Sequence, residues 1–292
     1  MKKFNGIFTA LVTPYDNKGN ISYSSLEKLI QKNLDEGVEG FYLTGSTGES
    51  YMLSMAEREY LVEAVMEIVG KRAEVIVNVG MFSTKHSIEL AKHAEELNVS
   101  AISSVPPFYF SFNMDEYVQF YNDLADAVSV PVIVYNIPAM SAVKFSMDDL
   151  TRLLSNEKII GLKHTSYDLF QLQQLVEQFP EKSIFIGHDE IYLSALSVGV
   201  SAGIGSTYNI MAGKFVQLNQ LFAAGKLQEA LKIQNEVNNV VSVLCEVGVF
   251  KGVKEILKLQ GIDCGECRKP FLPLTDEEKA KLKKVAIENG LL

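Results

Sequence analysis

Long apolar runs are missing from this 292-residue sequence. No run approaches the roughly 20 apolar residues that a bilayer-spanning helix needs, so we expect no membrane partner. The N-terminal stretch MKKFNGIFTALVTPYD has two lysines and a short apolar run. Thr9, Thr13 and Pro14 interrupt that run, and no small-residue cleavage site follows it. The stretch therefore predicts a first β-strand rather than a signal peptide.

Cysteine is scarce as well. Cys245, Cys264 and Cys267 are too few and too unevenly spaced for a disulfide scaffold. The pair in Cys264-Gly-Glu-Cys267 resembles half of a zinc ribbon, but the second half is absent. A redox pair would instead need to open a helix after a strand. We interpret all three as incidental thiols in a reducing cytoplasm.

Basic residues are outnumbered by acidic ones. The sequence has 27 Lys and Arg against 36 Asp and Glu, a net charge of −9 and a pI near 5.1. This charge argues against nucleic acid as a partner. The content of 47% hydrophobic and 22% charged residues is typical of a soluble globular protein. No metal site is predicted, because no obvious ligand set exists among the four histidines, His86, His93, His164 and His188.

Eight short β-rich runs alternate with longer helical patterns. They start about 20–35 residues apart, the span of a strand, a crossover helix and two loops. Most of their positions are apolar, which is typical of parallel strands covered on both faces. No Gly-x-Gly-x-x-Gly follows the first run, which disfavours a dinucleotide-binding sheet. The sequence predicts an α/β fold, a closed (β/α)8 TIM barrel, with strands at 6–12, 40–45, 75–80, 101–107, 131–136, 159–163, 183–187 and 202–207.

Three segments mark the starts of predicted helices. Ser24–Glu27, Ser54–Glu57 and Ser146–Asp149 each place a hydroxyl and a carboxylate where they cap the first N–H groups of a helix. Beyond about residue 225 the pattern is helical, with no further strand and no Pro/Gly/Ser-rich linker. We expect a barrel over 1–224 and a helical subdomain over 225–292 that packs on it.

Polar residues gather where the predicted strands end. In a barrel of this kind, chemistry sits at the carboxyl-terminal ends of the strands. The segments at these ends are Gly45–Glu49, Tyr135–Pro138, Lys163–Thr165, Gly187–Glu190 and Gly205–Tyr208.

Lys163 follows the apolar residues Ile159–Leu162 at one strand end. Lysine is almost never buried unless it is paired or has a function. Loss of hydration at such a place disfavours the ammonium and frees an amine that attacks ketones to form a Schiff base. The alternative is an ion pair with Asp189 or Glu190 that only holds the barrel mouth together.

Tyr135 ends the strand before Lys163. Its phenol is expected to lie beside the lysine across one strand spacing, under about 5 Å. A phenol in that position can transfer protons during Schiff-base chemistry. The alternative is a tyrosine that covers the core with its hydroxyl in water.

The segment Gly45-Ser-Thr-Gly-Glu49 predicts a tight loop whose backbone N–H groups and hydroxyls suit a carboxylate. Ser46-x-x-Glu49 also matches a helix capping box. Together, an amine, a phenol and an anion-binding loop on one rim fit an α-keto acid.

Over nearly its whole length, the sequence resembles a family, the pyruvate-dependent class I aldolases and lyases related to dihydrodipicolinate synthase. The lyase branch of the family fits best. The resemblance rests on the order of GSTGES (45–50), YNIPAMS (135–141), GLKHTS (161–166), GHDEIY (187–192) and GSTYNIM (205–211), and ends at CRKPF (267–271).

The resemblance implies a role for each of these segments. Lys163 would be the Schiff-base lysine and Tyr135 the proton-transfer residue. Ser46 and Thr47 would hold the pyruvyl carboxylate. No cofactor or metal would be needed, because the iminium withdraws electrons as a Lewis acid would. The polyhydroxylated tail of a sugar acid would contact Thr165, Gly187, Asp189, Glu190 and Ser206.

Tyr109 matches a tyrosine that this family contributes across a subunit contact, and barrels of this family are usually tetramers. We therefore expect a homotetramer, in which the aromatic PPFYFSF loop is a contact patch. Interface packing without a catalytic role is the alternative for Tyr109.

The substrate expected from the resemblance is N-acetylneuraminate, cleaved reversibly to N-acetylmannosamine and pyruvate. The dihydrodipicolinate branch has an arginine after its YN-x-P turn, whereas Ala139–Val143 has none, which favours a neutral, hydroxyl-rich aldehyde. Tyr167 stands where some lyases have glycine and is expected to narrow the groove. Alternatives are a sister aldolase for another 2-keto-3-deoxy acid, a dihydrodipicolinate synthase-like enzyme, or a silent sugar- or phosphate-binding barrel with Gly203-x-Gly205 at its phosphate loop.

Overall fold

Eight parallel strands close into a barrel in chain order, which confirms the predicted (β/α)8 fold. The computed structural model describes residues 3–292. Each strand pairs with the next along the chain, and β8 closes the ring on β1. The strands are β1 (Gly6–Ala10), β2 (Gly40–Leu43), β3 (Glu74–Asn78), β4 (Ala101–Ser104), β5 (Val132–Asn136), β6 (Ile159–His164), β7 (Ser183–Ile186) and β8 (Ala202–Gly205).

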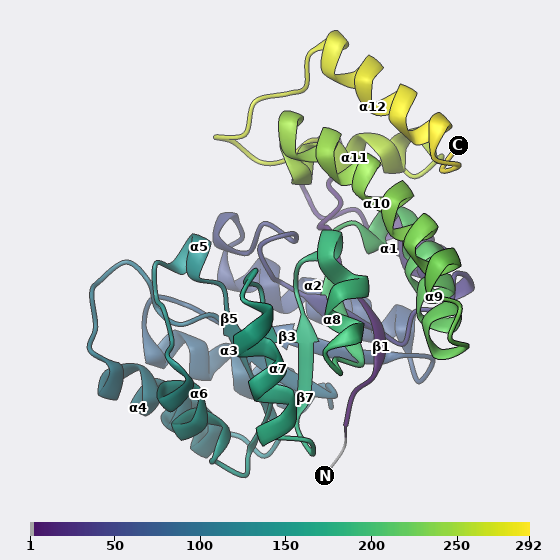
Figure 1. The fold of residues 1–292 in the computed structure, drawn as a ribbon. Coiled ribbons are helices and arrows are strands. Elements are labelled where there is room, and N and C mark those ends of the chain that lie inside the picture. The colour runs from purple at the N-terminus through teal and green to yellow at the C-terminus, as the bar shows by residue number, and fades with distance from the viewer. Residues whose placement is uncertain (1–2) are drawn as a thin grey trace.

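Helices follow the strands and cover the outside of the barrel (Figure 1). Among residues 3–292, no helix is both long and apolar enough to cross a bilayer. The helices are α1 (Tyr23–Asp35), η1 (Ser50–Met52), α2 (Met55–Val69), α3 (Thr84–Glu96), α4 (Met114–Ala127), α5 (Pro138–Ser141), α6 (Met147–Leu154), α7 (Leu169–Gln178), η2 (Asp189–Ile191), α8 (Tyr192–Ser197), α9 (Tyr208–Ala223), α10 (Leu227–Val247), α11 (Val249–Leu259) and α12 (Asp276–Glu288).

The capping predictions hold for two of the three segments. Ser54 and Ser146 open α2 and α6 with complete capping boxes. The prediction for Ser24 was wrong, because α1 begins at Tyr23, two residues earlier than a cap at Ser24 implies, and its cap is Ser22, whose side chain accepts from the Ser25 N–H. Ser22 keeps the extended backbone of a cap, whereas Ser24 already lies in the first helical turn.

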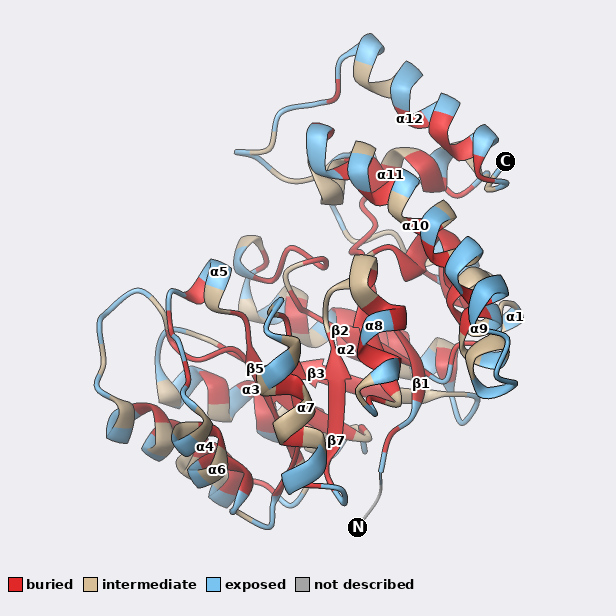
Figure 2. Cartoon of the chain, in the orientation of Figure 1, coloured by how far each residue is buried: buried red, intermediate tan, exposed pale blue. Residues whose placement is uncertain are grey.

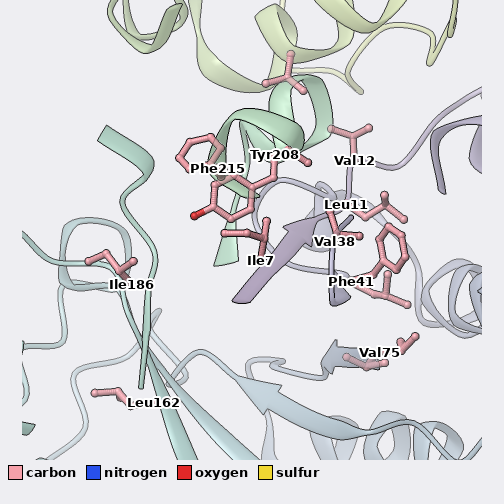
Figure 3. Packing of buried hydrophobic residues seen from close by; sticks show 14 of the residues in the cluster. Ile7, Leu11, Val12, Val38, Phe41, Val75, Leu162, Ile186, Tyr208 and Phe215 are labelled. Carbon is pink, nitrogen blue, oxygen red and sulfur yellow. The ribbon is translucent and has the colours of Figure 1, made fainter. Parts of the chain in front are cut away.

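The apolar side chains form two layers, one inside the barrel and one between strands and helices. The strands are buried except at Glu74, which is partly buried, whereas the helices expose their outer faces (Figure 2). Figure 3 shows part of the outer layer, where Tyr208 and Phe215 of α9 pack near Ile7 of β1. Burial on both faces explains why the strands are apolar at most positions.

An irregularity in β6 turns Lys163 into the barrel. Ile159 packs in the outer layer and Ile160 in the inner layer, so strict alternation would send Lys163 outward. The register with β5 skips Ile160, which shifts the alternation by one residue. Leu162 therefore packs outward and Lys163 points inward.

The C-terminal helices lie over the carboxyl-terminal ends of the strands (Figure 1). Gln234 of α10 connects them to the barrel: its amide group donates to the Asp189 carbonyl oxygen at 3.1 Å and accepts from the Leu193 N–H at 2.9 Å. We propose that the boundary between barrel and extension lies between residues 224 and 225. Gly225 has a φ of 73°, in the left-handed region that ends helices such as α9.

Candidate active site

Lys163 is buried at the carboxyl-terminal end of β6 and stacked against two tyrosines. Its Nζ lies 4.1 Å from the centroid of the Tyr135 ring and 4.4 Å from that of Tyr42. Tyr135 is the register partner of Lys163 on β5, as predicted. Only 4% of Lys163 is exposed, and within residues 3–292 no carboxylate oxygen lies within 4.0 Å of Nζ. The alternative that Lys163 is held by an ion pair with Asp189 or Glu190 is therefore wrong.

Asp189 and Glu190 have other partners. Asp189 Oδ2 accepts from both the N–H of Thr207, at 2.9 Å, and its hydroxyl, at 2.6 Å. Glu190 accepts from the Tyr167 hydroxyl at 2.6 Å and lies 3.0 Å from His188 Nδ1. Asp189 Oδ1 is buried with no hydrogen-bond partner among the described residues. A buried acceptor of this kind has an unmet need for a donor such as a substrate hydroxyl.

The two carboxyl groups differ in acidity. Burial raises the pKa of Asp189 to about 6, against the lowering effect of the hydrogen bonds from Thr207. Burial also pushes the pKa of Glu190 upward, but the hydrogen bonds from His188 and Tyr167 outweigh it and lower that pKa to about 2. At neutral pH both groups are anionic acceptors, and Asp189 is the one whose charge costs stability.

Asp189→Asn is expected to stabilise the fold at pH 8 by up to about 3 kcal/mol, since one pKa unit corresponds to about 1.4 kcal/mol. The unfolded chain ionises Asp189 near pH 4 but the folded chain only near pH 6, so the wild-type unfolding free energy falls as pH rises between these values. Urea unfolding at pH 8 and pH 4 measures the difference between variant and wild type. An equal difference at both pH values would contradict the assignment.

The loop after β2 presents two unpaired backbone N–H groups. The N–H groups of Gly48, Glu49 and Ser50 donate to carbonyl groups of the loop itself. Those of Ser46 and Thr47 have no partner within residues 3–292. Two free N–H groups beside two hydroxyls suit a carboxylate.

The alternative of a capping box at Ser46-x-x-Glu49 is wrong, because no side-chain cap opens η1 and the Glu49 carboxylate is bound elsewhere. Thr47 and Ser206 join the loop to the end of β8, with their hydroxyl oxygens 2.7 Å apart. Ser206 thus lies beside the Gly45–Glu49 loop.

Gly187 makes room for Thr165 and Lys163. A Cβ at Gly187 would lie 2.0 Å from Thr165 Oγ1, so the Thr165 side chain would have to move, and 3.2 Å from Lys163 Cε, which is a tight contact. Thr165 Oγ1 is buried without a partner among the described residues. These three predicted residues therefore meet at the ends of β6 and β7.

A cavity of about 180 Å³ adjoins the loop and has mainly apolar walls. It extends from Ser46 to the end of β5 and to the C-terminal extension. Its lining residues are Ser46, Glu49, Ser50, Tyr51, Met52, Val105, Phe108, Ile137, Met140, Ser141, Phe250 and Phe271.

Tyr109 does not join the other predicted residues within this chain. It is 77% exposed and lies in a surface cluster with Phe82, Phe108 and Phe110. Our prediction is that Tyr109 reaches the site of a second subunit.

Sequence reasoning missed Tyr42 and the residues of α10. Burial raises the pKa of the Tyr42 phenol well above its ordinary value, so it stays neutral beneath Lys163 and donates to Ser103 Oγ at 3.2 Å. Tyr42 lies two residues after Gly40 in β2 and therefore on the same face of the strand. This alternation could have predicted that Tyr42 points into the barrel. Gln234 and Asn238 reach the site region from a distant helix, where their amides donate to the Asp189 and Glu190 carbonyl oxygens. No local pattern marks them.

The cysteine pair has the properties of unreactive thiols. Burial raises the pKa of both Cys264 and Cys267 to about 12, and all three cysteines are free. Thiolates are the reactive form, and they are suppressed here. Within residues 3–292, no group of three or more His, Cys, Asp or Glu side chains is placed to hold a metal ion.

A barrel with a buried lysine, a neighbouring phenol and a loop with two free N–H groups at one face has the groups that Schiff-base chemistry requires. The model of the dihydrodipicolinate synthetase family matches residues 3–289. The chain belongs to this family and is a carbon–carbon lyase.

Three relatives show where the chain lies in the family. It is 38% identical over 283 residues to an N-acetylneuraminate lyase of Escherichia coli, covering 96% of this chain and 95% of the relative. The structure of CdNal from Clostridium difficile in complex with mannosamine is similar, with a TM-score of 0.95, 36% identity and coverage of 99% and 100%. A dihydrodipicolinate synthase from Bacillus anthracis is similar with a TM-score of 0.94, 31% identity and 98% coverage of each chain.

Proposed function

We propose that this protein cleaves N-acetylneuraminate reversibly to N-acetylmannosamine and pyruvate through a Schiff base on Lys163. The observation that carries the proposal is the buried, unpaired Lys163 amine beside the Tyr135 ring. A lysine amine that lies at the barrel mouth with no carboxylate partner within residues 3–292 is available as a nucleophile toward a keto group. Relatives named N-acetylneuraminate lyase support the choice of substrate.

The Lys163 amine attacks C2 of the open-chain keto acid, and loss of water gives an iminium. The C3–C4 bond then breaks, and its electron pair becomes the C2–C3 double bond of an enamine. Protonation at C3 and addition of water release pyruvate and restore the amine. This scheme needs no external cofactor or metal, because the iminium accepts the electrons.

Tyr135 takes the proton of the C4 hydroxyl as the aldehyde forms. Its register position opposite Lys163 supports this role, since a group one strand away reaches the carbons next to the imine. The same phenol can exchange protons with the carbinolamine. Tyr135 is thus the proposed acid–base residue.

The remaining residues would bind the two ends of the substrate. Ser46 and Thr47 would hold the carboxylate with their hydroxyls and free N–H groups, and Ser206 would support Thr47. The unpaired oxygens of Thr165 and Asp189 suit the hydroxyls of the tail. Gly187 and Glu190 would complete that side of the groove.

The test is a panel of substrates followed by pyruvate release, coupled to lactate dehydrogenase. N-acetylneuraminate should be the fastest substrate, and pyruvate with aspartate semialdehyde should give no cyclic product. Faster cleavage of another 2-keto-3-deoxy acid would identify a sister aldolase instead. A chain that neither cleaves these acids nor gains mass with pyruvate and borohydride would be a silent binding barrel.

We further propose that the protein is a homotetramer in the cytoplasm. The exposed aromatic cluster around Tyr109 and Phe110 supports a subunit contact, to which Tyr109 would contribute. Three unpaired thiols support a reducing compartment.

A further inference from the structure

A residue in the left-handed backbone conformation lies at each end of the loop that carries Ser46 and Thr47. Thr44 has a φ of 51° and Glu49 a φ of 57°, and neither is glycine. Residues with a Cβ adopt this region only where their surroundings hold them there, and such residues gather at functional sites.

Thr44 is held from within the barrel. Its hydroxyl donates to the Asn78 carbonyl oxygen at 2.5 Å, and Asn78 Nδ2 donates back to the Thr44 carbonyl oxygen at 2.7 Å. Strand β3 therefore fixes the first end of the loop.

Glu49 is held by the C-terminal extension instead. Lys254 Nζ of α11 donates to Glu49 Oε1 at 2.7 Å, and the Arg268 backbone N–H donates to Oε2 at 2.7 Å. The side chains of Lys254 and Glu49 are only 3% and 0% exposed. A carboxylate buried to this degree needs both donors, because water cannot replace them.

The Glu49 backbone connects these contacts to the N–H groups of Ser46 and Thr47. Its N–H donates to the Ser46 carbonyl oxygen at 3.1 Å, and the Gly48 carbonyl oxygen accepts from Thr13 Oγ1 at 2.7 Å. If Glu49 left its left-handed conformation, the bond to Ser46 would break, and the free N–H groups of Ser46 and Thr47 would change direction.

We propose that Glu49 is a positioning residue for the substrate carboxylate and that Lys254 and the Arg268 main chain hold it in place. The C-terminal extension thereby sets the affinity of a barrel site for keto acids. This inference rests on the proposed function of the Ser46 and Thr47 loop.

Lys254→Met is expected to raise the half-saturating pyruvate concentration in borohydride trapping at least tenfold. Trapping by hydroxyacetone, a ketone without a carboxylate, should change less than twofold. In cleavage assays the KM should rise while kcat stays within threefold, since the carboxylate contact is the same in the ground and transition states. Glu49→Gln, which replaces one acceptor oxygen by a donor, should act in the same direction and provides a second variant if Lys254→Met does not fold.

Glu57→Gln is the matched control. Glu57 binds the Arg268 guanidinium from the outer side without touching the loop, and glutamine preserves its role in the α2 cap. It should leave the pyruvate response unchanged. If trapping by pyruvate and by hydroxyacetone weakened equally, or if neither Lys254→Met nor Glu49→Gln changed the pyruvate response, the inference would be overturned. The proposed function would not be affected. Failure of the unsubstituted protein to trap pyruvate would overturn the proposed function and this inference with it.

Discussion

Lys163→Met is expected to lower kcat by about 10³-fold or more, because no other group can form the iminium on which bond cleavage depends. Mass spectrometry after borohydride reduction should show a pyruvate adduct on the wild-type peptide containing Lys163 and none on the variant. The fold should not suffer. Within residues 3–292 Lys163 has no carboxylate partner, so a methionine of similar length leaves no unpaired carboxylate in the barrel.

Lys182→Met is the control for losing any buried lysine. Lys182 is 5% exposed at the start of β7, where its amine donates to the Ile159 carbonyl oxygen at 2.7 Å. This variant should lose stability but keep its adduct and most of its activity. A pyruvate adduct on a residue other than Lys163 would refute the Schiff-base assignment.

Tyr135→Phe should cut kcat by about 10²- to 10⁴-fold, the usual contribution of a positioned acid–base group. Imine formation with pyruvate should fall much less, because the ring that stacks on Lys163 is kept. Single-turnover cleavage and borohydride trapping, measured on the same sample, separate the two steps.

Tyr121→Phe provides the comparison for loss of a buried phenol. Tyr121 of α4 donates to the Ser104 carbonyl oxygen at 2.7 Å and also contacts the Tyr135 main chain, but its phenol lies outside the barrel interior. Removal of its hydroxyl should lower the thermal midpoint without changing the ratio of cleavage to trapping. If Tyr135→Phe behaved in the same way, its phenol would have no part in proton transfer.

The barrel and the strand-end chemistry were predictable from local pattern. Apolar runs at regular spacing specify parallel strands, and residues that follow each strand must share one rim. The adjacency of Tyr135 and Lys163 followed from this rule. Roles for the surrounding residues came from resemblance, because a side chain's partners depend on segments far along the chain.

The sequence by itself determined eight strands, their order and the rim on which Lys163, Tyr135 and the Gly45–Glu49 loop stand, since each depends on periodicity within about 30 residues. Only the tertiary structure decided that Lys163 points inward, because a register shift against β5 sets the direction of its side chain. It also decided what holds the loop, since Glu49 and Lys254 are 205 residues apart and meet only when the C-terminal helices fold back over the barrel.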